Sequence, residues 1–108
     1  MGHPDVGRRA DLAGRAVAVA ELLRVLSNRH RLMIVCALVE GEYAVGQLEA
    51  VLGIRQPTLS QQLTVLREAG LVETRRDARQ IYYRLTEDKA ARLIEAVHEI
   101  FCGRDGPA

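Results

Sequence analysis

The strongest constraint on the fold is a change in the spacing of apolar residues after Gly70. Before it, apolar residues recur every three or four positions, as on one face of a helix. Between residues 71 and 85 they alternate, as in half-buried strands, and after Thr86 the helical spacing returns. The sequence therefore predicts four helices, a hairpin and a last helix.

Caps and glycines divide the region before Gly70 into four predicted helices. The first has apolar residues at Leu12, Ala16, Val19, Leu23 and Leu26. Ser27 is expected to cap the second, which ends before Gly41 and is apolar nearly all round, as a buried central helix would be. The third spans residues 45–52 and ends at Gly53, and the fourth starts near Gln56-Pro57 because proline suits a first turn.

The rest of the chain predicts a hairpin and one more helix. Strands are expected over residues 71–77 and 80–85, with Thr86 capping the last helix. That helix has an apolar stripe of Ala90, Leu93, Ile94, Val97, Ile100 and Phe101. The order α-α-α-α-β-β-α, mainly α with a small β-hairpin, is typical of a winged helix-turn-helix domain.

At 108 residues the chain has room for one core, which we place in residues 11–102, between a flexible arm (1–10) and a frayed tail (103–108). No apolar run approaches the ~20 residues of a membrane span, so no membrane partner is expected. Glu21 and Arg24 interrupt the alanine- and valine-rich run near the N-terminus, which we interpret as a helix and not as an export signal. A cytoplasmic location is expected, where cysteines stay reduced.

Basic residues are concentrated in one part of a nearly neutral chain. The net charge is +1, but residues 55–84 contain six arginines against three acidic residues, an excess of +3 that leaves −2 for the remainder. A basic strip of this kind favours contact with DNA on one face of the molecule.

The predicted helix–turn–helix would place its second helix in the major groove of duplex DNA. The candidate DNA-binding residues at its start are Arg55, Gln56, Thr58, Ser60, Gln61 and Gln62, and those around the hairpin tip are Arg75, Arg76 and Arg79. Amide and hydroxyl side chains hydrogen-bond to base edges, and arginines in a wing contact phosphates or the minor groove. Either set alone is more typical of a solvated surface or a protected sheet edge, but the two together in this order favour DNA.

Other classes of function have less support. The sequence contains no phosphate-binding loop, nucleophile–base pair or metal motif, so no enzyme activity and no cofactor are expected. His98, with Asp88 and Glu99 nearby, lacks the second histidine that zinc would favour, and we interpret it as a solvated or interface residue. A winged helix that binds proteins instead of DNA stays an alternative.

Five segments resemble the ArsR family of winged-helix repressors. They are residues 26–32 (LSNRHRL), 45–49 (VGQLE), 56–63 (QPTLSQQL), 66–72 (LREAGLV) and 79–85 (RQIYYRL). Gln62 departs from the pattern, since many members have histidine there. The resemblance implies a transcriptional repressor that forms a homodimer through its first and last helices and reads inverted-repeat operators.

Cys36 and Cys102 have two interpretations. Taken by themselves, Cys36 is a small core residue and Cys102 is incidental. Their positions and local sequences, however, resemble the dithiol pair of the persulfide-responsive branch of the ArsR family. That resemblance implies a redox sensor in which a low-molecular-weight persulfide is the inducer and cross-linking of the two cysteines releases DNA. A sensor of metal, haem or general oxidants is the alternative.

Overall fold

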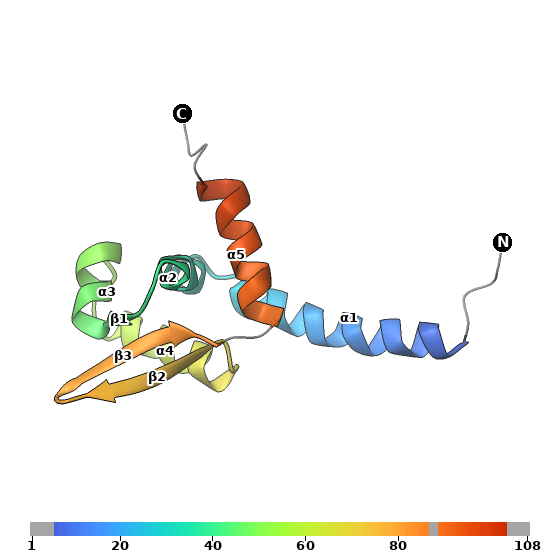
Figure 1. Cartoon of the computed structure of the whole chain (residues 1–108), viewed down its shortest axis with the longest axis horizontal. Helices are drawn as coiled ribbons and strands as arrows, with labels where there is room; N and C mark the ends of the chain where they lie inside the picture. The colour runs from blue at the N-terminus through green and yellow to red at the C-terminus, as the bar shows by residue number, and fades with distance from the viewer. Residues whose placement is uncertain (1–5, 87–88, 104–108) are drawn as a thin grey trace.

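A computed structural model describes residues 6–86 and 89–103 and has the predicted architecture (Figure 1). Its elements are α1 (Val6–Leu26), α2 (Arg29–Val39), β1 (Tyr43–Ala44), α3 (Val45–Leu52), α4 (Thr58–Glu68), β2 (Val72–Asp77), β3 (Gln80–Leu85) and α5 (Lys89–Cys102). The winged helix-turn-helix fold is therefore confirmed, with one additional short strand.

Helix α2 lies at the centre of the core. Its buried residues Ile34, Val35 and Leu38 lie on one face, and the helix contacts α1, α3, α4, β3 and α5. The core is completed mainly by Leu48, Leu59, Leu63, Leu66 and Ile94. The predicted central position of this helix is confirmed, although Leu32 and Met33 on its other side are 37% and 39% exposed. Cys36, Ala37 and Val39 are half-buried, so the side of α2 away from Ile34 is only partly covered.

The structure corrects one predicted helix cap. Asn28, not Ser27, caps α2, and its side-chain Oδ1 accepts a hydrogen bond from the Arg31 N–H at 3.0 Å. Thr86 donates its hydroxyl proton to the carbonyl of Gly70 at 2.9 Å, which joins the end of the hairpin to the turn after α4. Residues 87–88, through which Thr86 was expected to cap the last helix, lie outside the described residues.

The turn between α3 and α4 depends on Gly53. This residue has φ 71°, in the left-handed region, and its N–H donates to the Glu49 carbonyl at 2.9 Å. Glycine adopts this conformation without the steric cost that a side chain would add. The turn sets the angle at which α4 leaves α3.

The hairpin belongs to a three-stranded antiparallel sheet with the order β1-β3-β2. Strand β2 pairs with β3 from Val72↔Leu85 to Asp77↔Gln80, and Ala78 in the tight turn has φ 57°. Strand β1 adds the pair Tyr43↔Tyr83. The sequence did not predict β1, because two residues are too few to show a strand period.

Helices α1 and α5 extend away from the body formed by α2–α4 and the sheet (Figure 1). The radius of gyration is 16.5 Å, whereas a compact chain of about 100 residues has about 13 Å. Because α1 begins at Val6, it includes residues 6–10 of the segment expected to be a flexible arm. Residues 1–5 and 104–108, which hold the rest of the predicted arm and most of the predicted tail, lie outside the described residues. In the described ranges, no helix has the length and hydropathy needed to span a bilayer.

Alanine substitutions at two glycines of the same helix–turn unit are expected to have opposite effects. Gly53→Ala should lower the free energy of unfolding by about 1–2 kcal/mol, because its left-handed backbone disfavours any Cβ. Gly46→Ala, within α3 and with open space around the added Cβ, should raise it by up to ~1 kcal/mol. Urea denaturation of both variants measures this, and equal effects would contradict the assigned role of Gly53.

Candidate nucleic-acid interface and cysteine pocket

The predicted reading helix has one buried and one exposed face. Leu59, Leu63 and Leu66 are buried, at spacings of four and three residues, and dock α4 on the core. Arg55, Gln56, Ser60 and Gln61 are exposed, whereas Thr58 and Gln62 are half-buried. The structure thus brings the predicted polar residues together around the start of α4, with most of them open to solvent.

Gln56 and Ser60 are bonded to each other at the start of α4. The Gln56 Oε1 accepts from the Ser60 N–H at 3.3 Å and also from the Ser60 hydroxyl. This arrangement satisfies an N–H group in the first turn of the helix, which has no partner within the helix itself. Gln61, next to this pair, is exposed and has no side-chain hydrogen bond within the described part of the chain.

Gln62 is held by a residue that sequence reasoning missed. The Nη1 of Arg31 donates to Gln62 Oε1 at 2.8 Å, and its Nε donates to the carbonyl of Val25 at 2.6 Å. Arg31 therefore ties the end of α1 and the middle of α4 to α2, and it occupies the amide oxygen of Gln62. Arg31 lies in the 26–32 segment, but no spacing in the sequence connects it to α4.

The arginines of the wing differ in their environments. Arg76 and Arg79 are exposed near the tip. Arg75 is anchored instead, since its Nη2 donates to Glu42 Oε1 at 2.8 Å and its guanidinium lies 4.7 Å from the centre of the Tyr82 ring. The hydrogen bond from Arg75 lowers the pKa of the Glu42 carboxyl, with a smaller contribution from the charge of Arg84.

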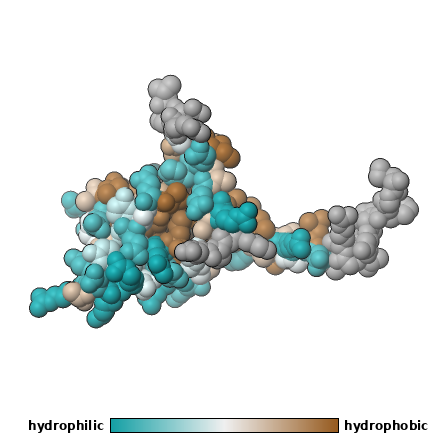
Figure 2. All heavy atoms as spheres, in the orientation of Figure 1, coloured by the Kyte–Doolittle hydropathy of each residue, from teal (hydrophilic) through white to brown (hydrophobic). Residues whose placement is uncertain are grey.

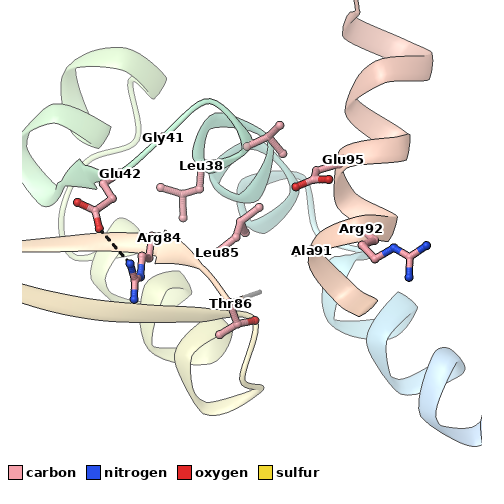
Figure 3. A pocket seen from close by; sticks show the side chains of 10 residues that line it. Leu38, Gly41, Glu42, Arg84, Leu85, Thr86, Ala91, Arg92 and Glu95 are labelled. Carbon is pink, nitrogen blue, oxygen red and sulfur yellow. Dashed lines mark ion pairs between the residues drawn. The ribbon is translucent and has the colours of Figure 1, made fainter. Parts of the chain in front are cut away.

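A hollow of about 680 Å³ lies between the base of the wing, α2 and α5 (Figure 3). Its lining includes Leu38, Glu42, Arg84, Leu85 and Glu95. Glu42 and Arg84 form an ion pair at 3.8 Å across its edge, and Arg84 also bonds Glu73 at 2.7 Å. These paired charges fasten the wing to the segment after α2.

A second hollow, of about 280 Å³, contains both cysteines. Its lining residues are Met33, Cys36, Ala37, Glu40, Tyr43, Val51, Leu52, His98 and Cys102. Cys36 is half-buried in α2, Cys102 is exposed at the end of α5, and both are free thiols. The fold thus brings together two residues that are 66 positions apart in the sequence.

The cysteine pocket contains a thiol with a raised pKa and a histidine close to a carboxylate. Burial raises the pKa of the Cys36 thiol, and the nearby Cys102 raises it further. His98, whose side chain is only 20% exposed, places Nε2 3.5 Å from Glu40 Oε2. Within the described residues, no three His, Cys, Asp or Glu side chains are arranged to hold a metal ion, and Asp88 lies outside those residues.

Comparisons with known proteins agree with this geometry. Residues 28–74 match the model of the "Bacterial regulatory protein, arsR family". The chain is 60% identical to the biofilm growth-associated repressor of Xylella fastidiosa over 100 residues, 93% of this chain and 88% of that protein. The crystal structure of the repressor BigR from Xylella fastidiosa superposes with a TM-score of 0.86, covering 93% of this chain and 99% of the other.

The chain belongs to the ArsR family. A homodimeric winged helix-turn-helix DNA-binding domain from Mycobacterium bovis is also similar, at 34% identity and a TM-score of 0.69, covering 93% of this chain and 89% of that one. The protein described here is accordingly an ArsR-family transcriptional repressor, and its relatives are DNA-binding regulators, not enzymes.

The two thiols of this ArsR repressor should differ in reactivity. We expect iodoacetamide at about pH 7 to modify Cys102 roughly tenfold faster than Cys36, because the raised pKa and half-burial of Cys36 leave less accessible thiolate. Mass spectrometry of the reduced protein after brief exposure measures both rates. Faster modification of Cys36 would contradict the burial seen here.

Proposed function

We propose that this ArsR repressor binds duplex operator DNA as a homodimer, with α4 of each copy in a major groove and the wing beside it. The observation that carries the proposal is the exposed polar face of α4 opposite its buried leucines. Two such helices read successive major grooves when their centres are about 34 Å apart. An inverted-repeat operator would match the twofold symmetry of the dimer.

The exposed apolar residues of α1 and α5 support the dimer. On α1, Leu12, Val17 and Leu23 are 67%, 72% and 51% exposed, and on α5, Ile100 and Phe101 are 72% and 74% exposed. Figure 2 shows hydrophobic surface along both projecting helices, whereas the wing is hydrophilic. Burying each such side chain stabilises by about 1.5–3 kcal/mol. A second copy packed on these helices would also cover the extensions that enlarge the radius of gyration.

The candidate DNA-binding residues have different proposed roles. Gln61 and the NH₂ group of Gln62 would contact base edges, and Ser60 and Thr58 would contact bases or phosphates. Gln56 would hold the helix start in place for these contacts. The cationic Arg55, Arg76 and Arg79 would bind phosphates or the minor groove, while Arg75, anchored by Glu42, would orient the wing.

Substitutions should separate base reading from phosphate contact. Gln61→Ala should weaken binding to the operator by about 1–3 kcal/mol and weaken non-specific binding much less. Arg79→Ala should weaken binding to all duplexes and reduce the slope of log affinity against log salt by about one. Arg92→Ala, which removes a cation outside the proposed DNA contacts, is the control for charge; gel filtration checks that this variant still dimerises, because Arg92 lies on α5 (Figure 3). Unchanged binding in both test variants would exclude the proposed interface.

We further propose that Cys36 and Cys102 sense a low-molecular-weight persulfide. The support is that one pocket holds both thiols and that Cys102 influences the pKa of Cys36. The Cys102 thiolate attacks the terminal sulfur of the persulfide RSSH, which forms Cys102–S–SH and releases RS⁻. The Cys36 thiolate then attacks Sγ of Cys102, which forms the disulfide and releases HS⁻. If the Cys102 persulfide first attacks another RSSH, it forms Cys102–S–S–SH and releases a second RS⁻. Attack by the Cys36 thiolate on the sulfur bonded to Sγ of Cys102 then closes a bridge with one extra sulfur atom and releases HS⁻.

A cross-link between α2 and α5 would couple the sensor to DNA binding. Helix α2 packs against α4, and α5 belongs to the proposed dimer interface. A covalent bond between α2 and α5 would therefore link the proposed reading helix α4 to the partner subunit. A coupling free energy of about 1–3 kcal/mol corresponds to a ~5–150-fold change in affinity. This change is enough to release the repressor from its operator.

Persulfide treatment should therefore weaken operator binding by the native protein ~5–150-fold. The same treatment should leave operator binding by the Cys36→Ser and Cys102→Ser variants unchanged. Fluorescence anisotropy measures the affinity, and mass spectrometry detects loss of both thiols with or without added sulfur. Equal release by hydrogen peroxide would favour a general oxidant sensor. Release by metal ions or haem alone would favour those alternatives, and unchanged affinity after complete cross-linking would refute the sensor.

A further inference from the structure

His98 and Glu40 join the two cysteines in an arrangement that spacing alone does not reveal. Cys36 and Glu40, the C-cap residue of α2, are four residues apart, and His98 and Cys102 are four residues apart on α5. Side chains four apart lie on the same face of a helix. Each helix therefore presents one thiol and one proton-binding group to the same pocket, and His98 meets Glu40 across it at 3.5 Å.

The surroundings of Cys36 disfavour the thiolate form of this residue. The pKa of Cys36 is raised by its burial and by the neighbouring Cys102. Cys102 is the last residue of α5 and is exposed to solvent. A thiol must nevertheless lose its proton before it can attack sulfur. A group that accepts this proton is needed for the chemistry proposed above.

The titratable groups that line the pocket indicate which side chain can accept the proton from a thiol. Besides the two thiols, they are Glu40 on α2, Tyr43 on β1 and His98 on α5. A carboxylate is too weak a base at neutral pH, and a tyrosine hydroxyl holds its own proton there. An imidazole is the side chain whose ordinary titration range lies near neutrality. The remaining lining residues, Met33, Ala37, Val51 and Leu52, carry no charge.

We propose that His98, oriented by Glu40, takes the proton from the Cys102 thiol and so makes Cys102 the attacking nucleophile of the dithiol. With Nε2 facing Glu40, Nδ1 is the ring nitrogen that accepts the proton. The step converts Cys102–SH and neutral imidazole into Cys102–S⁻ and imidazolium, whose charge is balanced by the Glu40 carboxylate. The thiolate then attacks RSSH, and RS⁻ takes up the proton as RSH. This inference rests on the proposed sensing function.

The test is the rate at which iodoacetamide modifies Cys102 in the reduced full-length protein, measured by mass spectrometry at about pH 7 and about pH 10. His98→Gln should slow the reaction roughly tenfold at the lower pH, where a base is needed. At the higher pH, solvent hydroxide removes the proton, and the rates of variant and native protein should converge. Glu40→Gln should give a smaller slowing at the lower pH.

His30→Gln is the matched control, since His30 is a half-buried histidine at the start of α2 and does not line the pocket. It should leave the Cys102 rate unchanged at both pH values. A His98→Gln rate equal to the native rate at the lower pH, or reduced equally at both, would overturn the assignment of His98.

The sensing function itself is tested separately by operator release. If persulfide fails to release the native protein while His98→Gln still slows alkylation, the sensing proposal fails and the base assignment stands. If persulfide releases DNA and His98→Gln alkylates normally, the sensing proposal stands and the role of His98 is refuted.

Discussion

Burial of one face of α2 positions every functional part of this repressor. Ile34, Val35 and Leu38 pack against elements from both ends of the chain, so the docking of α4, the wing and α5 all depends on the same helix. Protein interiors are closely packed, so a small change in the position of one side chain affects its neighbours. Cys36 lies on the same helix, so a covalent change there would act on the helix that contacts both α4 and α5.

Polar cross-links supplement this core at three places. Arg31 ties α1 and α4 to α2, Glu42 holds the wing through Arg75 and Arg84, and Glu40 meets His98 on α5. Each joins α2, or the segment just after it, to an element with a proposed function. Exposed ion pairs contribute little to stability, so their main effect here is to orient side chains and elements.

The candidate sites were predictable to different degrees. The polar start of α4 follows from local pattern, since the leucine spacing that buries one face of a helix also exposes the opposite one. Sequence alone placed Arg75 with Arg76 and Arg79 at the tip, but the structure pairs Arg75 with Glu42, 33 residues away. His98 was assigned to a solvated or interface position because its partner Glu40 lies on another helix. Pairings of this kind have no signature in local spacing.

The sequence by itself determined the order of helices and strands, the glycine turn before the reading helix and the leucine face of α4, because periodicity and caps act between neighbours along the chain. The ArsR assignment also followed from short segments of sequence. Only the tertiary structure decided that β1 joins the sheet, that Leu32 and Met33 of α2 stay exposed, and that Cys36, Glu40, His98 and Cys102 share one pocket. Contacts between distant segments depend on how helices pack, and an apolar stripe specifies which face is buried but not the side chains that it meets.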